Sequence, residues 1–210
     1  MNTKSHVGFW LALFLGMFLL NPLLRNHESM ERFVVTEMSL TRSTFGDRTA
    51  DWLSERASIV YNVYTPAGSV AAATVRGEDM RRTMRVVPGP GVAATKAFNG
   101  YVEGLVLNFL VAVHRFFIFL IWFLVLAPVF VASVIDGLVQ RAIKRSEFGA
   151  IRPAAYSVTS MTVIPMAMAP LIYLALPLPI TPLVSPLWAL LMIMPLSAMV
   201  SNMQPIFGRN

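Results

Sequence analysis

The residues that most often carry chemistry are few in this chain, and they are far apart. The three histidines, His6, His27 and His114, fall in different segments, and none is paired with Asp or Glu at the spacing of a metal site. No zinc-protease motif, Walker phosphate loop or nucleophile elbow is present. The chain has no cysteine, which excludes disulfides and thiolate metal sites. We therefore expect no enzymatic activity, no metal and no cofactor.

A second group of polar residues is more informative, and it consists of Asp136, Arg141, Lys144 and Arg145. If a helix continues past Ile135, Gln140 lies one turn after Asp136, and the three cations form a stripe that leaves the membrane. Basic residues near anionic lipid contribute about 1 kcal/mol each, so the stripe predicts a lipid anchor and a topology signal. Docking to an acidic partner is a second interpretation, and the two are compatible.

The elements that carry these residues are very apolar. The chain is 56% hydrophobic and 13% charged, whereas soluble domains have about 25% charged residues. Uncharged stretches cover Val7–Leu24, Phe116–Ile135 and Tyr156–Val200. Crossing a bilayer takes roughly 20 helical residues, so the first two stretches predict one span each. The third predicts two spans joined by a turn at Leu176–Pro182. The predicted fold class is an all-α integral membrane protein with four transmembrane helices.

The register of the second span depends on His114 and Arg115. A span that starts at Leu105 places Arg115 inside the bilayer, at a cost of about 2.5 to 3.5 kcal/mol. A span that starts at Phe116 leaves both residues at the outer interface, and this register is preferred. The helical pattern itself begins earlier, from Val92.

Between the first two spans, residues 25–104 form a mostly helical extracytoplasmic loop of roughly 80 residues. Apolar residues recur there at the helical spacing of three and four, namely Ala50, Leu53, Ala57, Val60 and Tyr64. Asp47 is the expected cap of this helix, and Pro88–Gly91 predicts a hinge. In a loop that stands alone, nothing covers the apolar face. Leu53, Ala57 and Val60 are therefore predicted to contact a partner.

Basic residues in short loops set the orientation. With four spans they all fall on one side, which places both termini in the cytoplasm. The expected segments are a transmembrane anchor (1–24), the extracytoplasmic loop (25–104), the second transmembrane helix (105–135), a cytoplasmic basic loop (136–155), a Pro-rich transmembrane hairpin (156–202) and a cytoplasmic tail (203–210).

The string VIDGLVQRAIKRSEFG at Val134–Gly149, followed by Tyr156 and the Pro-broken segment Ile172–Pro177, resembles an uncharacterised family of membrane proteins from integrating conjugative elements and conjugative plasmids. The order of spans and loops is also similar to that of this family. The resemblance implies a component of the bacterial conjugation machinery, in elements that carry a type IV secretion system and a coupling ATPase. It implies no functional residues.

Together these features predict a non-enzymatic subunit of the conjugative DNA transfer machinery in the bacterial inner membrane. The expected partners are membrane lipid and other inner-membrane conjugation or secretion proteins, the coupling ATPase among them. The net charge is +6, but the basic residues are interspersed with acids, so no direct contact with nucleic acid is expected. Self-association into a homo-oligomer remains open.

Two other functions remain as alternatives. The prolines between Pro165 and Pro195 break helices at membrane depth, as in a small transporter or channel-like protein. Against this interpretation, the uncharged stretches contain no Asp, Glu, Lys or Arg that could drive coupling. The other alternative is an entry-exclusion or immunity protein, whose outer loop would recognise a donor apparatus.

Overall fold

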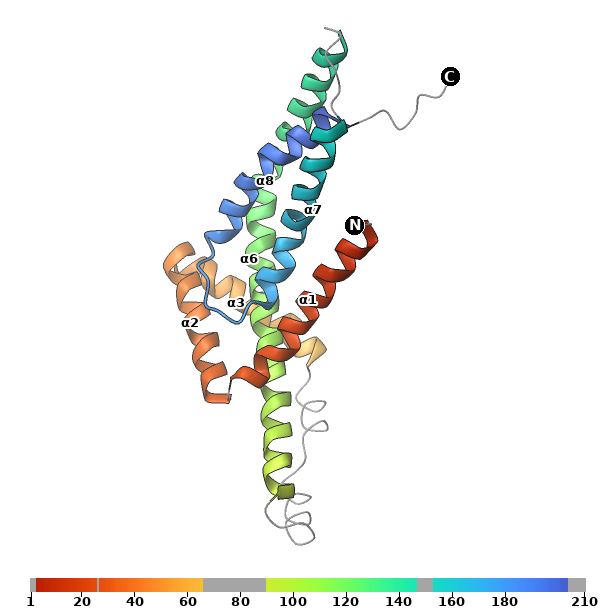
Figure 1. Ribbon diagram of the computed structural model, residues 1–210. Coiled ribbons are helices and arrows are strands. Elements are labelled where there is room, and N and C mark those ends of the chain that lie inside the picture. Colours follow the sequence, from red (N-terminus) through yellow and green to blue (C-terminus); the bar gives the residue numbers. More distant parts are fainter. Residues whose placement is uncertain (1–2, 26, 66–89, 147–152, 204–210) are drawn as a thin grey trace. The chain divides into compact units, whose positions relative to one another are not determined.

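The computed structural model describes residues 3–25, 27–65, 90–146 and 153–203, and within these ranges the secondary structure is helical, without strands. The helices are α1 (Thr3–Leu24), α2 (His27–Phe45), α3 (Asp47–Tyr64), α6 (Pro90–Ser146), α7 (Pro153–Ala175) and α8 (Val184–Ser201) (Figure 1). By length and composition, α1, α6, α7 and α8 could each cross a membrane. The all-helical class and the four long apolar helices are confirmed.

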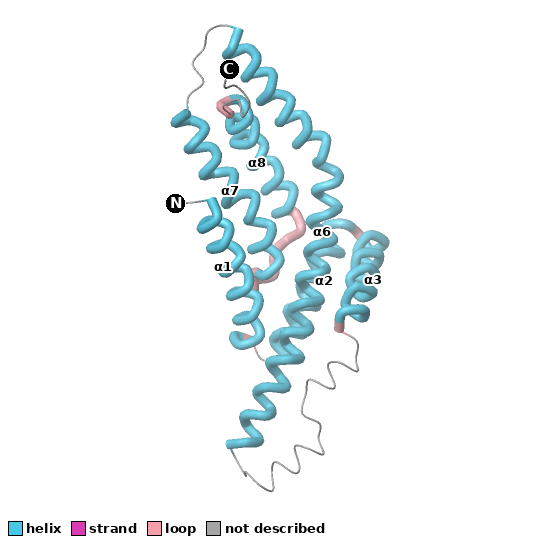
Figure 2. The backbone as a smooth tube through the Cα atoms, turned by 90° about the vertical axis from the view of Figure 1, so that its right-hand side faces the viewer, coloured by secondary structure: helices cyan, strands magenta, loops and turns pink. Residues whose placement is uncertain are grey.

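The chain divides into two compact units. Unit 1 comprises Met1–Leu11, Phe119–Leu171 and Leu183–Asn210, and unit 2 comprises Ala12–Ile118 and Ile172–Pro182. Three of the long helices, α1, α6 and α7, contribute to both units. Unit 2 also contains α2, α3 and the connection between α7 and α8, which Figure 2 draws as a loop.

In unit 2, α2 and α3 are amphipathic and pack against each other (Figure 2). Met30, Phe33 and Val34 of α2 form a buried core with Val111 of α6. These residues follow the three-and-four spacing that places apolar side chains on one face of a helix. Covering this apolar face stabilises α2 as a helix.

The junction between α2 and α3 differs from the prediction. Gly46, rather than Asp47, is the N-cap of α3, and its φ of +78° is a conformation that glycine adopts without strain. Asp47 is the first helical residue, and its carboxylate lies 3.1 Å from Nε of Arg42. A positive φ suits glycine far better than aspartate, which explains the shift of the cap by one residue.

A single helix, α6, runs from Pro90 to Ser146. It contains the predicted second transmembrane segment (105–135) and continues beyond it at both ends. Proline fits the first position of a helix because its missing N–H is not needed there. Pro90 and Gly91 therefore belong to α6 rather than to a hinge, and Pro88 and Gly89 lie outside the described residues.

Prolines inside the apolar helices leave backbone carbonyls without their usual donor, and neighbouring helices supply it. Pro22 cannot donate to the carbonyl of Phe18, which instead accepts a hydrogen bond of 2.9 Å from Nδ2 of Asn108. Likewise, Pro170 cannot donate to the carbonyl of Met166, which accepts 2.6 Å from Nε1 of Trp188.

In unit 1, the Trp188 ring also packs between two aromatic rings of α6. Its centroid lies 5.2 Å from that of Phe119 and 6.0 Å from that of Phe130. A second contact joins α6 and α8 nearer their C-terminal ends, where the hydroxyl of Ser133 donates to the carbonyl of Ile193 at 2.8 Å. Polar and aromatic contacts together hold α8 against α6.

Candidate functional site

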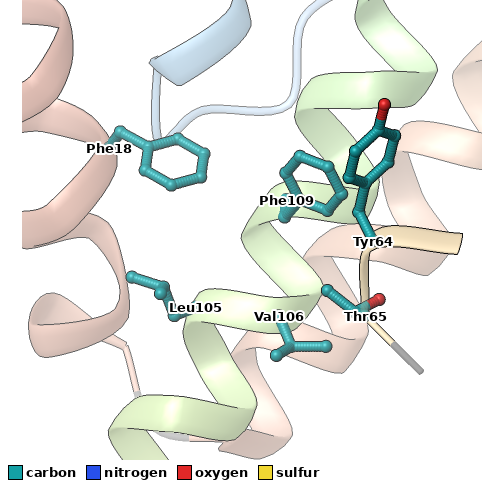
Figure 3. Close-up of a pocket in the computed structure, with 6 residues that line it drawn as sticks. All are labelled: Phe18, Tyr64, Thr65, Leu105, Val106 and Phe109. Atoms are coloured by element: carbon teal, nitrogen blue, oxygen red, sulfur yellow. The ribbon is translucent and has the colours of Figure 1, made fainter. Parts of the chain in front are cut away.

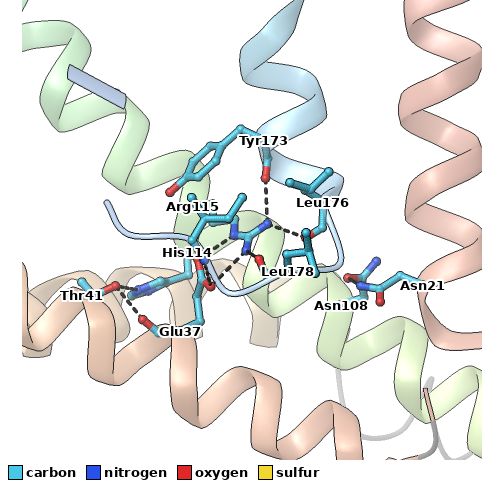
Figure 4. Close-up of polar contacts among 10 residues, drawn as sticks. Asn21, Glu37, Thr41, Asn108, His114, Arg115, Tyr173, Leu176 and Leu178 are labelled. Carbon is cyan, nitrogen blue, oxygen red and sulfur yellow. Dashed lines mark hydrogen bonds and ion pairs between the residues drawn. The ribbon is translucent and has the colours of Figure 1, made fainter. Parts of the chain in front are cut away.

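The most buried charges of unit 2 form an ion pair between α6 and α2. Arg115 is 0% exposed and Glu37 is 2% exposed. Nε of Arg115 donates to Oε1 of Glu37 at 2.7 Å, and Nη2 donates to Oε2 at 3.0 Å (Figure 4). This is the bidentate geometry in which a guanidinium binds a carboxylate most strongly.

The remaining donors of the guanidinium bind backbone carbonyls at the end of α7. Nη1 donates to the carbonyls of Tyr173 at 2.8 Å and Leu176 at 2.7 Å, and Nη2 donates to that of Leu178 at 2.6 Å (Figure 4). The helical donor to Tyr173 would be the N–H of residue 177, but that residue is proline. Arg115 therefore replaces the missing donor, and its charge is favourable at a helix C-terminus.

Glu37, Arg115 and these three carbonyls are called the Arg115 network below. Glu37 makes a further contact with the same connection, because its Oε2 accepts from the N–H of Ile180 at 3.3 Å. Arg25 donates to the carbonyl of Pro177 and lies 4.4 Å above the Phe33 ring. The connection between α7 and α8 is thus held by side chains from α2, α6 and the end of α1.

Next to the Arg115 network, a further buried hydrogen bond joins α2 to α6. The hydroxyl of Thr41 lies 3.0 Å from Nε2 of His114, and both side chains are buried. A further buried hydrogen bond in unit 2 joins α1 to α6, where Nδ2 of Asn21 donates to Oδ1 of Asn108 at 2.6 Å (Figure 4). Within the described ranges, no group of three or more His, Cys, Asp or Glu could hold a metal ion.

The Arg115 network was not anticipated from the sequence, which placed His114 and Arg115 at an interface. All five N–H groups of the guanidinium are used within the chain, so its burial is fully compensated. The sequence did contain an indication that Glu37 is the partner of Arg115. Glu37 and Thr41 continue the three-and-four spacing of Met30 and Phe33 on the apolar face of α2. A carboxylate on a buried face requires a cation.

In unit 1, the sequence-predicted residue Asp136 joins α6 to α8. Its Oδ2 accepts from Nε2 of Gln140 at 2.8 Å and from the hydroxyl of Ser197 at 2.6 Å. The contact with Gln140 one turn later is the one that the spacing predicts. Two turns beyond Asp136, Lys144 donates to Oγ of Ser201 and Oδ1 of Asn202, both at 3.2 Å.

These contacts lie along an open groove of about 600 Å³ between α6 and α8, called the α6–α8 groove below. Its α6 wall consists of Val129, Ala132, Ser133, Asp136, Gln140 and Lys144, and its α8 wall of Ile193, Met194, Ser197, Ala198, Ser201 and Asn202. The helices approach closely beside it. A Cβ on Gly137 would lie 2.7 Å from the carbonyl oxygen of Ser197 and 2.8 Å from Cβ of Val200.

The predicted cationic stripe is divided by the structure. Lys144 is half-buried and lines the groove, whereas Arg141 and Arg145 are not among the lining residues. Arg141 is half-buried and Arg145 is exposed. The three cations share one face of α6, at positions i, i+3 and i+4, but only Lys144 lines the groove.

The apolar face of α3 also differs from the expectation. Leu53 and Ala57 are 0% exposed and Val60 is half-buried. The argument for a partner assumed that nothing covers this face, but the chain itself buries Ala50, Leu53 and Ala57, while Tyr64 stays 73% exposed. Leu53 and Ala57 are core residues, and they present no surface to a partner.

A small apolar pocket of about 300 Å³ lies in unit 2 and is lined by Phe18, Tyr64, Thr65, Leu105, Val106 and Phe109 (Figure 3). Aromatic rings and aliphatic chains dominate its walls. The hydroxyls of Tyr64 and Thr65 are the polar side-chain groups of this lining, and no chemistry is assigned to it.

Comparison with known proteins gives the setting of these sites. The family model for IncC plasmid conjugative DNA transfer protein DtrJ-like matches residues 27–208. This chain belongs to the DtrJ-like family. The family is involved in conjugative DNA transfer, and the resemblance to a conjugative plasmid family is confirmed. Searches of curated proteins and of solved structures found no match.

The DtrJ-like match includes every residue of the Arg115 network and of the α6–α8 groove. It begins after α1, so the helices within it are α2, α3, α6, α7 and α8. Both sites are therefore features of the segment that defines this protein as DtrJ-like.

Proposed function

We propose that this DtrJ-like protein is a non-enzymatic, multi-pass inner-membrane subunit of the conjugative DNA transfer machinery, and that it docks to the coupling ATPase. The observation that carries the proposal is the family match over residues 27–208, a segment that contains three of the four apolar helices. A conjugative DNA transfer protein built mainly of such helices belongs in the membrane through which the DNA passes.

The outer surface of α8 supports a membrane or protein environment. Its exposed apolar side chains are Leu187, Leu190, Leu191 and Met194, of which Met194 is 80% exposed. Large apolar side chains gathered on one helix are costly in water, and lipid or a partner helix covers them. Where partner helices meet in lipid, association relies on close packing at small residues.

The non-enzymatic assignment is supported by how the polar side chains are used. Glu37, Arg115 and Asp136 bind other parts of the same chain, where they hold helices together. A catalytic group needs free donors or acceptors directed at a substrate. The Arg115 network has none left on its guanidinium.

The proposal is tested in cells that carry the native conjugative element. Deleting the gene should reduce transfer frequency to background, and a C-terminally tagged copy should restore it. From those cells, the tagged protein extracted in mild detergent should co-purify with the coupling ATPase in a fixed ratio. Purification of the protein as a self-contained oligomer would argue instead for transport or exclusion, and normal transfer without the gene would contradict the proposal.

Membrane topology is tested separately with reporter fusions. A fusion after Asn210 should report the cytoplasm, and a fusion within residues 66–89 should report the opposite side. Extraction of the protein from membranes by alkaline carbonate would contradict integral insertion. Reporters on the same side would contradict the proposed order of spans.

A further inference from the structure

The α6–α8 groove is polar at one end and apolar at the other. On α6, Asp136, Gln140 and Lys144 succeed one another by single turns toward the end of the helix, where α8 also ends at Ser201. In the opposite direction, the lining becomes Val129, Ile193 and Met194.

The apolar end continues along the same seam. A narrow cleft between the two helices shares Val129 and Ile193 with the groove and extends it to Leu126, Phe130, Ala189 and Leu190. A molecule with a polar head and a long apolar chain matches this lining, with its head at the polar end and its chain along the apolar part.

The polar end keeps unused bonding capacity. An ammonium has three donors, and Lys144 directs two of them at neutral oxygens, at 3.2 Å each. It forms no ion pair with any carboxylate of residues 3–25, 27–65, 90–146 or 153–203. A partly buried cation that has no counter-ion among these described residues favours an anionic group beside it.

We propose that the α6–α8 groove binds one glycerophospholipid, with its phosphodiester at Lys144 and an acyl chain along the seam between α6 and α8. A partner transmembrane helix fits less well, because an apolar helix would exclude water from Asp136 and Lys144 without supplying an anionic group to the lysine. Arg141 and Arg145 lie within one turn of Lys144 and raise the local potential, so an anionic headgroup such as phosphatidylglycerol is preferred.

The test is native mass spectrometry of the full-length protein in detergent, with phosphatidylglycerol, phosphatidylethanolamine or diacylglycerol added in turn. The wild type should retain one phosphatidylglycerol, less phosphatidylethanolamine, and no diacylglycerol, which has the acyl chains but no phosphate. Lys144→Ala should weaken phosphatidylglycerol retention about tenfold, the effect of losing one charge-assisted contact. Lys144→Arg should retain most of it.

Lys96→Ala is the matched control, because Lys96 is an exposed lysine of the same helix that lies in unit 2. It should bind phosphatidylglycerol like the wild type. A second variant, Ala132→Leu, narrows the groove at an exposed position without touching Lys144. It should also reduce retention, because the added side chain occupies the path of the acyl chain. Thermal unfolding in the same detergent confirms that each variant is folded.

Three results would overturn the proposal. Equal retention of diacylglycerol would remove the role of the phosphate, and unchanged binding by folded Lys144→Ala would remove the role of the lysine. A dimer mass without bound lipid, lost on Ala132→Leu, would assign the groove to a second copy of the chain. The inference does not depend on the proposed partner, since lipid retention is measured on the isolated protein.

Discussion

The Arg115 network of unit 2 and the α6–α8 groove of unit 1 are built from similar side chains but use them differently. Arg115 donates all five of its N–H groups to its own chain, and its carboxylate partner is equally buried. Lys144 donates two long hydrogen bonds to neutral oxygens beside an open groove. A buried charged group whose donors are all hydrogen-bonded within the chain stabilises the fold. A charged group at a groove with a donor left over is available to a ligand.

The largest expected effect is on the saturated side of this comparison. Arg115→Ala should lower the free energy of unfolding by about 3 to 5 kcal/mol, because it leaves the buried Glu37 carboxylate without its counter-ion and three carbonyls without this donor. Thermal unfolding of the full-length protein in detergent measures the loss. The control is Arg42→Ala, which removes an exposed arginine paired with Asp47 and Asp51 and should cost below about 1 kcal/mol.

A double variant sharpens this result. Replacing both charges, as in Glu37→Gln with Arg115→Met, should cost less than the sum of the single changes, since neither charge is then left alone. Equal costs for Arg115→Ala and Arg42→Ala would show that the Arg115 network does not stabilise the protein.

The next effect concerns the close approach of α6 and α8. Gly137→Ala should destabilise the protein by about 1 to 3 kcal/mol, because the new methyl group meets backbone 2.7 Å away. Gly100→Ala in the same helix has nothing within 4 Å and should stabilise the protein by up to about 1 kcal/mol. Thermal unfolding compares the two. The same sign for both changes would contradict the packing described for unit 1.

A smaller effect tests whether side chains replace the donors that prolines remove. Trp188→Phe should cost about 1 kcal/mol beyond its change in packing, because the carbonyl of Met166 loses its donor. In a Pro170→Ala background, residue 170 has an N–H that can bind this carbonyl, so the same change should cost less. Unfolding measurements on the four proteins of this cycle isolate the hydrogen bond from the ring contacts.

The smallest effect on stability is expected at the groove. Lys144→Ala removes two 3.2 Å hydrogen bonds from a half-buried side chain and should cost below about 1 kcal/mol. Its effect on lipid retention should be far larger than its effect on unfolding. A loss of stability as large as that of Arg115→Ala would remove the distinction between the two regions.

Several features could be predicted from the sequence because they depend on local patterns. The long apolar helices follow from uncharged stretches long enough to cross a bilayer, and the connection near Leu176–Pro182 follows from its prolines. The pair Asp136 and Gln140 follows from one turn of helix. Each depends on residues that are close in the chain.

Other features could not be predicted in this way. The bond between Glu37 and Arg115 spans 78 positions, and the sequence placed the arginine at an interface instead. The apolar face of α3 could be recognised from its spacing, but what covers it could not. Nor could the sequence separate Lys144 from Arg141 and Arg145, since the difference depends on where α8 ends.

The sequence by itself determined where the apolar helices lie, because helix formation and hydrophobic length are properties of contiguous residues. Only the tertiary structure decided which charges are saturated and which remain available. A hydrogen bond acts over about 3 Å, and bringing donor and acceptor together from distant segments requires the packing of the whole unit. The polar residues of this chain therefore received their roles from the helices packed beside them.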